Sequence, residues 1–435
     1  MMLSGWGRYP AIECRTQVLR QLDEVGPVLS DNQSLIARGN GRAYGDASLN
    51  PDKTLCMGGC DRFREFDAER GVVDCEAGML LSDLLDIVVP RGWFPPVVPG
   101  TKFVTIGGLI AADVHGKNHH RDGSFGSHVE SLRLAMADGT VKTCSRDDNA
   151  EIFEATLGGM GLTGIILSAR VRLRPIASDA IDETVLRANS LDALLRLFAE
   201  HDGATYSVAW IDCLAKGEQF GRGVLMLGEH AAAARGAAKQ APSGAGGGLS
   251  VPIELPISPL NTLTIKAFNE LFFRFQIPKT RRRHYSGFFF PLDAVQNWNR
   301  IYGRRGFVQY QCVIGGSQSE EALRRILTLV AEMGSGSFLA VLKKLGPGNR
   351  YMSFPVEGYT ITLDFPARPD VLSGLAKLDA VVAEHKGRIY LAKDARAPRD
   401  LIEQGYPDIG AFRKLRASID PGRKFRSALS ERLGL

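Results

Sequence analysis

Residues 34–175 alternate short apolar runs with glycine-rich turns and lie within a first expected domain at 1–175. The apolar positions predict a strand, a helix closed by a glycine, a hairpin, a helix that begins at an asparagine, and a long strand. The hairpin carries Asp138-Gly139, a strong turn signal. The five elements are expected at 72–79, 80–92, 129–145, 149–161 and 162–176. This order predicts an α+β fold and not the regular βαβ alternation of a doubly wound sheet.

Residues 176–380 mix strands and helices and predict a second domain, an antiparallel sheet covered by helices. Strands are expected at 204–213, 307–314 and 359–366, and a helix at 320–334. Within this domain, residues 231–250 are rich in small residues and glycine. That composition predicts a flexible loop, either a lid beside a pocket or a surface excursion. Residues 381–435 form a third, C-terminal segment.

Composition narrows the class of protein. With 44% hydrophobic and 23% charged residues, the chain is typical of globular proteins. A net charge of +5 is too weak for a nucleic-acid footprint by itself but suits an anionic cofactor and substrate. Seven scattered cysteines predict reduced thiols and a cytoplasmic location. Neither a signal peptide nor a membrane-spanning apolar run is predicted.

Two glycine-rich loops carry the candidate chemistry. The first, "ARGNGRAYGD" at 37–46, has Tyr44 where the dinucleotide-binding motif G-x-G-x-x-G needs its third glycine. The second, "PGTKFVTIGGLIAADVHGKNHH" at 99–120, has a tight turn at Pro99 and a predicted helix that opens at Gly107-Gly108. Backbone N–H groups in such a turn, and at a helix N-terminus, can bind a pyrophosphate. Together the loops predict a cofactor held from two sides.

Both loops, with "GGMGLTGII" at 158–166 and "IYLAKDAR" at 389–396, resemble the FAD-linked oxidases of the vanillyl-alcohol-oxidase type. The resemblance extends from "SGWGR" near the start to "IDPGRKFRSALSERL" near the end. It implies a two-domain α+β flavoprotein in which an FAD-binding domain of the PCMH type is followed by a substrate (cap) domain. Residues 381–435 are then expected to return to the FAD-binding domain.

The resemblance also implies which residues contact FAD. Pyrophosphate contacts are expected from the first loop, namely Arg38, Gly39, Asn40, Gly41, Arg42, Ala43, Tyr44 and Gly45. The second loop is expected to contribute Gly100, Thr101, Thr105, Gly107, Gly108 and His115. Backbone contacts are expected at Ile165, and Tyr390 is expected beside the isoalloxazine. Relatives with covalent flavin have a histidine where this chain has Arg42, so FAD is expected to be non-covalent, with attachment at His115 as the alternative.

The candidate catalytic residues are His115, Lys393 and Tyr44. Oxidation of a secondary alcohol needs a flavin as hydride acceptor and a base within hydrogen-bond reach of the hydroxyl. Lys393 is expected to orient the substrate and to balance charge at the flavin, and either His115 or Lys393 is expected to take the proton. Substrate contacts are expected from Lys117, Gln309, Gln311, Lys343 and Thr362. Thr362 stands where actinobacterial relatives have a cysteine, so no thiol chemistry is expected there.

Two further patterns have weaker functional interpretations. His115 and His119 have the i, i+4 spacing of a zinc-binding helix, but no glutamate or third ligand completes the motif, and no metal is expected. Residues 268–292 combine aromatic side chains with the basic run Arg281-Arg282-Arg283-His284. This segment is either a docking surface for an anionic inner membrane or a cap-domain element with a solvated basic edge.

The resemblance implies oxidation of a sugar C–OH to a ketone. The expected substrate is a phosphorylated or polyprenylphosphoryl pentose, oxidised at its 2′-hydroxyl as the first half of an epimerisation. An NAD(P)H-dependent short-chain reductase is the expected partner for the second half. The alternative from the same chemistry is an aldonolactone or alditol oxidase that acts on a free sugar. A catalytically silent flavoprotein subunit is disfavoured, because a binding module has no need for His115 and Lys393 beside the flavin.

Overall fold

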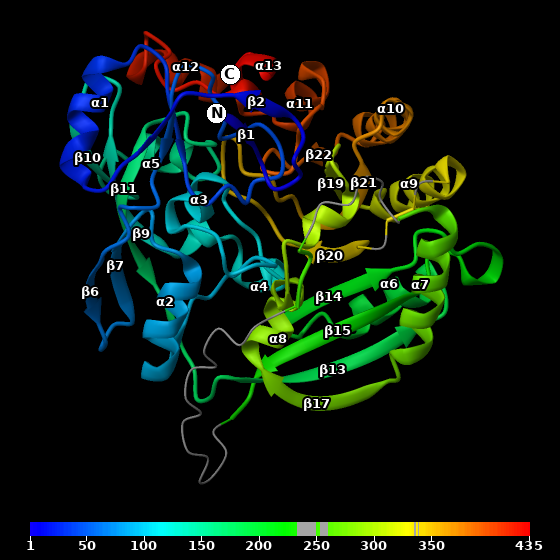
Figure 1. Ribbon diagram of the computed structural model, residues 1–435. Helices are drawn as coiled ribbons and strands as arrows, with labels where there is room; N and C mark the ends of the chain where they lie inside the picture. The colour runs from blue at the N-terminus through cyan, green and yellow to red at the C-terminus, as the bar shows by residue number, and fades with distance from the viewer. Residues whose placement is uncertain (233–248, 253–259, 335, 338) are drawn as a thin grey trace.

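The fold comprises two α+β domains and a C-terminal segment (Figure 1). The computed structural model describes residues 1–232, 249–252, 260–334, 336–337 and 339–435. Residues 233–248 of the predicted loop at 231–250 lie outside the described residues. Antiparallel sheets dominate both domains, so the predicted α+β class is confirmed.

The first domain contains a three-stranded parallel sheet and a five-stranded antiparallel sheet. The parallel sheet has the order β3 (Thr16–Val18), β5 (Thr54–Cys56) and β4 (Ile36–Arg38). The antiparallel sheet has the order β10 (Val141–Ser145), β9 (Val129–Ala135), β11 (Ile165–Arg172), β7 (Val72–Glu76) and β6 (Phe63–Asp67). Five helices accompany them, α1 (Val25–Asp31), α2 (Leu81–Val88), α3 (Ile106–Ala111), α4 (His119–Asp122) and α5 (Ala150–Thr156).

Turn and helix-end residues in the first domain lie where the sequence predicted them. Strands β9 and β10 pair as a hairpin around Asp138 and Gly139, and the glycine has a φ of +87° that suits it. Helix α2 and the short 3-10 turn after it end at Gly92, which has a φ of +82°. Helix α5 begins after Asn149, which occupies the N-cap position as predicted. The Asn149 side chain accepts no hydrogen bond from the helix; its Nδ2 donates to the carbonyl of Thr143 and so joins α5 to the hairpin.

The cap domain is built on one eight-stranded antiparallel sheet, and helices cover one of its faces (Figure 1). Its order is β17 (Lys279–His284), β13 (Ala180–Ala188), β15 (Gly223–His230), β14 (Tyr206–Ile211), β20 (Val341–Leu345), β21 (Gly358–Pro366), β19 (Phe307–Gly315) and β22 (Arg388–Ile389). The sheet therefore extends beyond residue 380, where the cap was expected to end. Helices α6 (Leu191–Glu200), α9 (Ser319–Met333) and α10 (Pro369–Glu384) contribute apolar side chains to its core.

Alternation along the cap strands separates a core face from a polar face. Strand β19 is buried along nearly its whole length, yet it contains Gln309 and Gln311. Its alternate residues Val308, Tyr310 and Cys312 belong to the core cluster that also contains residues of α9 and α10. Because successive side chains of a strand point to opposite faces, both glutamines face away from the helices. This second face is directed at the FAD-binding domain and forms one wall of the candidate site.

The C-terminal segment returns to the first domain. It contains α11 (Arg399–Gly405), α12 (Ile409–Ile419) and α13 (Ala428–Leu433). Figure 1 shows these helices beside the N-terminal strands. Leu35 bridges Phe425, and Phe425 is buried in the cluster that contains Leu35 and Leu55. Among the described residues, no helix is long and apolar enough to cross a membrane.

A buried carboxylate joins the two domains just before the second glycine loop ends. Asp113 is fully buried and follows α3. Its oxygens accept hydrogen bonds from Ser124 Oγ (2.6 Å) and Gly126 N (3.1 Å) in its own domain. They also accept from Asn349 Nδ2 (2.9 Å) and Ser353 Oγ (2.5 Å), which follow β20 of the cap. Asp113 thereby fixes the position of His115, two residues later, relative to the cap sheet.

We expect Asp113→Ala to lower the free energy of unfolding by roughly 3 kcal/mol, because four donors would lose a buried charged acceptor. Denaturant unfolding of the flavin-loaded protein measures this change. Asp138→Ala is the control, because Asp138 accepts its bonds in an exposed turn and should cost less than about 1 kcal/mol. Equal destabilisation by the two variants would show that Asp113 does not join the domains.

Candidate active site

A cavity of about 820 Å³ lies between the polar face of the cap sheet and the two glycine loops. Its volume is within the range of ligand pockets in proteins. Nearly all of the predicted site residues line it. They are Gly39, Asn40, Gly41, Arg42, Ala43, Tyr44, Gly100, Thr101, Thr105, Gly107, Gly108, His115, Lys117, Gln309, Gln311, Lys343, Thr362, Tyr390 and Lys393.

Three predicted residues do not line the cavity. Arg38 lies behind the first loop, where its guanidinium donates to Ser48 Oγ and to the carbonyl of Ser4. A Cβ on Gly45 would lie 1.7 Å from the carbonyl oxygen of Asp394, so this glycine allows close packing. The side chain of Ile165 is buried in the core with Leu35 and Phe425. Because strand residues alternate, its neighbours Gly164 and Ile166 line the cavity instead.

The first loop presents a row of unused backbone donors. In the part of the chain that the structure describes, the N–H groups of residues 40–43 donate to no acceptor. Gly41 has a φ of +64°, a left-handed conformation that helps a loop to direct consecutive N–H groups to one side. Unsatisfied N–H groups beside a cavity are costly unless a ligand or water accepts from them. The loop is therefore suited to bind an anion such as a pyrophosphate.

The second loop contacts the first loop directly. The side-chain Nδ2 of Asn40 donates to the carbonyl of Phe103 at 2.8 Å. A Cβ on Gly39 would lie only 2.1 Å from Thr105 Oγ1, so glycine is needed at this approach. Two segments sixty residues apart thus form one continuous wall, as the pairing of the two motifs predicted.

The N-terminus of α3 does not offer the anion contact that the sequence predicted. The N–H groups of Ile106 and Gly107 donate to the carbonyls of Met79 and Ala77, and that of Gly108 donates to Thr105 Oγ1. The first two bonds anchor α3 to the segment after β7, and the third is the N-cap bond of the helix. The N–H groups of Gly100 and Thr101 remain unbonded among the described residues, so the tight turn is the better candidate for the second contact.

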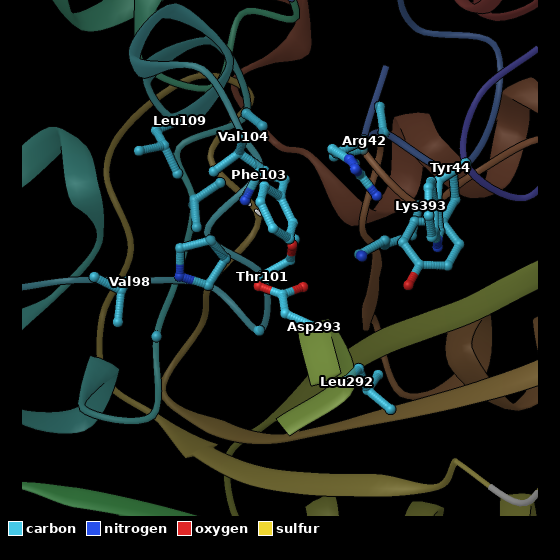
Figure 2. Close-up of a pocket in the computed structure, with 18 of the residues that line it drawn as sticks. Arg42, Tyr44, Val98, Thr101, Phe103, Val104, Leu109, Leu292, Asp293 and Lys393 are labelled. Carbon is cyan, nitrogen blue, oxygen red and sulfur yellow. Dashed lines mark hydrogen bonds between the residues drawn. The ribbon is translucent and has the colours of Figure 1, made fainter. Parts of the chain in front are cut away.

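Figure 2 shows Arg42, Tyr44 and Lys393 on one side of the cavity and Thr101 and Phe103 on the other. The Arg42 guanidinium lies over the ring of Trp6, 4.0 Å from its centroid. Asp293, from a short 3-10 turn of the cap, accepts from the N–H of Lys102 at 2.8 Å. No local sequence pattern indicates Asp293, because its hydrogen bond joins residues 191 positions apart.

Three lysines share this cavity. Burial lowers the pKa of Lys117 to about 7, that of Lys343 to about 8 and that of Lys393 to about 7. Lys343 further lowers the pKa of the other two by charge repulsion. Lys117 lies over the ring of Phe288 and donates to the carbonyl of that residue. A cavity with this excess of positive charge favours anionic ligands.

His115 is poorly placed to act as a base. Its Nε2 lies 2.9 Å from Gln311 Nε2, and its buried Nδ1 has no hydrogen-bond partner among the residues that the structure describes. Burial, and to a smaller extent the charge of Lys343, holds the pKa of His115 well below its usual value. The ring is therefore neutral. The rings of Phe354 and Tyr390 pack on it, with centroids 5.3 Å and 5.0 Å away.

The other histidines of the second loop bind separate backbone groups. His119 Nδ1 accepts from the N–H of Gly346, and His120 Nε2 lies 3.0 Å from the carbonyl oxygen of Ala204. Within the described residues, no group of three potential metal ligands comes together.

Lys393 lies against the first loop. Its Nζ is 3.6 Å from the centroid of the Tyr44 ring, and the N–H of Tyr44 donates to the carbonyl of Ala392. The charge of Asp364 raises the pKa of Lys393, which counteracts part of the effect of burial. Asp364 itself accepts from Gln309 Nε2 at 2.6 Å and from the hydroxyl of Tyr302 at 3.3 Å.

Asp364 is a second site residue, besides Asp293, that the sequence motifs did not indicate. It is buried on β21, and burial raises its pKa to about 7. The available signal was the period-two pattern of Thr360, Thr362 and Asp364 in an otherwise apolar strand. Thr362 itself lines the cavity, as predicted.

Comparisons with known proteins identify the family. A family model described as an FAD binding domain matches residues 24–145, which include both glycine loops. The decaprenylphosphoryl-beta-D-ribose oxidase of Mycolicibacterium smegmatis is 34% identical over 100% of this chain and 97% of its own length. The chain belongs to the FAD-linked oxidases of the vanillyl-alcohol-oxidase type. Its cofactor is FAD, and it is an FAD-dependent oxidoreductase.

More distant members of this family are similar over shorter stretches. The L-gulonolactone oxidase of Mus musculus is 29% identical over 37% of this chain and 38% of its own length. The D-lactate dehydrogenase of Archaeoglobus fulgidus is 31% identical over 26% of this chain and 27% of its own length.

The N–H groups at 40–43 and at Gly100 and Thr101, which are unbonded among the described residues, fit the pyrophosphate of the family's cofactor.

We expect FAD to be dissociable, because a guanidinium at position 42 cannot form the bond that a histidine makes to flavin. Acid precipitation of the purified yellow protein should release all of its FAD into the supernatant, where absorbance measures it. The same treatment of Arg42→Ala controls for losses caused by weaker binding. Flavin that stays with the precipitated parent protein would contradict the expectation and direct attention to His115.

Proposed function

We propose that the protein oxidises a secondary hydroxyl group of a sugar phosphate or polyprenylphosphoryl sugar to a ketone. The observation that carries the proposal is the presence of Lys117, Lys343 and Lys393 in one cavity, all with a pKa lowered by burial. A neutral sugar would leave this charge uncompensated, whereas a phosphate would stabilise it. The name of the full-length relative, a decaprenylphosphoryl-beta-D-ribose oxidase, supports a pentose attached to a polyprenyl phosphate.

The reaction removes a hydride from carbon and a proton from oxygen. Bound FAD supplies the hydride acceptor. We assign the proton to Lys393, whose pKa of about 7 leaves a substantial fraction of the free amine at neutral pH. His115 is then a hydrogen-bonding residue that holds Gln311 in place, and Tyr44 supports the Lys393 ammonium with its ring. Gln311, Thr362 and Lys343 are proposed to bind the sugar hydroxyls and phosphate.

The ketone product of such a reaction can be reduced from the opposite side to give the epimeric alcohol. We therefore also propose that the enzyme is the oxidative half of an epimerisation, with an NAD(P)H-dependent short-chain reductase as its partner. The second candidate is the oxidation of a free aldonolactone, which the similarity to L-gulonolactone oxidase favours. That similarity covers 37% of this chain, whereas the polyprenylphosphoryl-ribose relative covers all of it.

Anaerobic bleaching of the flavin absorbance separates these candidates. The substrate panel contains ribose, arabinono-1,4-lactone, ribose 1-phosphate and farnesylphosphoryl-ribose. Bleaching by the phosphorylated or prenylated pentoses alone would support the proposal. Faster bleaching by the free lactone would overturn it in favour of the second candidate.

We expect Lys393→Ala to retain FAD but to slow flavin reduction by roughly 10²-fold or more, the usual scale for a lost acid–base group. Stopped-flow reduction under anaerobic conditions measures the rate. Lys344→Ala is the matched control, because Lys344, which follows Lys343 on β20, forms an ion pair with Asp202 and does not line the cavity. Lys393→Arg should rescue little, because the planar guanidinium differs from a compact ammonium. A Lys393→Ala rate within about threefold of the parent rate would rule out Lys393 as the proton acceptor.

The rate of reduction should rise with pH through about 7, because the base is the deprotonated amine of Lys393. Asp364 raises the pKa of this amine, so Asp364→Asn should shift the rising limb of the pH profile to lower pH. Asp379→Asn is the control, since this other buried carboxylate pairs with Arg396 and not with Lys393. A profile that moves equally in both variants, or in neither, would exclude Asp364 as a positioning residue for Lys393.

A further inference from the structure

The polar face of the cap sheet changes character across neighbouring strands. Gln311 of β19 lies opposite Thr362 of β21, which lies opposite Val341 of β20, which in turn lies opposite Trp210 of β14. Residues that pair directly across a sheet share a face, and neighbouring strands lie about 4.8 Å apart. The row therefore runs from amide and hydroxyl groups beside His115 to an indole ring roughly 14 Å away. All four residues line the cavity.

The apolar end of this row continues outward through an aromatic ladder. The Trp210 ring contacts that of Phe272 with a centroid distance of 4.7 Å. Phe272 stacks on Phe268 at 5.8 Å, and both phenylalanines also line the cavity. They belong to α7 (Thr262–Phe275), whose adjoining side is buried through Ile265, Asn269 and Phe273.

The ladder leads to exposed apolar side chains on the same helix. Leu271 is 54% exposed and Phe275 is 72% exposed. At about 100° per residue, both lie on the side of α7 that carries Phe268 and Phe272. The exposed apolar surface is thus continuous with the interior of the cavity, a feature that marks a binding site more often than an ordinary surface.

We propose that Val341, Trp210 and Phe272 bind the hydrocarbon chain of the substrate, and that the chain leaves the cavity across Leu271 and Phe275 of α7. This inference rests on the proposed function, because it assigns the tail of an amphiphilic substrate whose phosphorylated head lies near the lysines. Two basic residues of the cavity lining, Arg281 and Arg283, both pair with the buried Glu183. The carboxylate compensates part of their charge.

Binding of prenyl phosphates tests the inference without catalysis. Calorimetry with the flavin-loaded enzyme compares isopentenyl, geranyl and geranylgeranyl phosphates, each below its critical micelle concentration. The parent should bind the twenty-carbon compound at least about tenfold more tightly than the ten-carbon compound, because each buried methylene is favourable. The chain-length gain should be lost in Phe272→Ala and reduced in the double variant Leu271→Ser/Phe275→Ser.

Two comparisons make the result specific. Isopentenyl phosphate, which is too short to reach the exit, should bind the parent and the double variant equally. Val141→Ser is the matched control for exposure, since Val141 is 48% exposed on the distant β10, and it should retain the full chain-length gain. Leu271 and Phe275 are surface residues, so their variant keeps the test valid if Phe272→Ala does not fold.

An absent chain-length gain in the parent, or an unchanged gain in both α7 variants, would overturn the tail site. Neither result bears on the proposed function, which fails only if phosphorylated and prenylated pentoses do not reduce the flavin. Conversely, a chain-length gain that depends on α7 supports the tail site even if the oxidised sugar proves to be different.

Discussion

The active site depends on the burial of three ammonium groups in one cavity with few carboxylates to compensate them. Desolvation, with charge repulsion from Lys343 acting on the other two, brings the pKa of Lys117, Lys343 and Lys393 down to about 7–8. Of the nearby acidic groups, Glu183 is already held by two arginines, and Asp364 has its own pKa raised to about 7. This imbalance makes an anionic ligand favourable, and the same desolvation leaves a fraction of Lys393 as the free amine at neutral pH, the form that the proposed proton acceptor requires.

The fold maintains this imbalance through the alternation of its buried strands. Apolar residues of β14, β19 and β21 face the helices, so the sheet is anchored from one side by a large hydrophobic core. The opposite face is then free to carry Gln309, Gln311, Thr362 and Asp364 without a cost in core packing. Hydrogen bonds among these groups, such as that from Gln309 to Asp364, satisfy the polar atoms that burial would otherwise leave unpaired.

Contacts between the domains hold the candidate catalytic side chains in place around the cavity. Asp113 joins the loop before His115 to the segment after β20, and the backbone of Tyr44 binds that of Ala392 beside Lys393. Each candidate catalytic side chain is therefore held by a contact to a segment that is remote in sequence. The gradient from Gln311 to Trp210 on the same sheet then gives the cavity a polar end and an apolar end. One sheet face can in this way serve both parts of an amphiphilic substrate.

Short-range chemistry in the sequence was sufficient for the α+β class, the hairpin at Asp138-Gly139, the helix that ends at Gly92, and the two glycine loops. Each of these depends on residues within a few positions, such as a glycine that adopts a positive φ. Nearly all of the residues that the family motifs indicated line the cavity, because the motifs lie on the two loops and strands that form it. Tertiary structure alone decided that Ile165 faces the core, that the first N–H groups of α3 are already bonded, and that Asp364 lies close to Lys393. These outcomes depend on strand register and on contacts between segments tens to hundreds of residues apart, and no local pattern specifies which of two alternating faces will meet a distant partner.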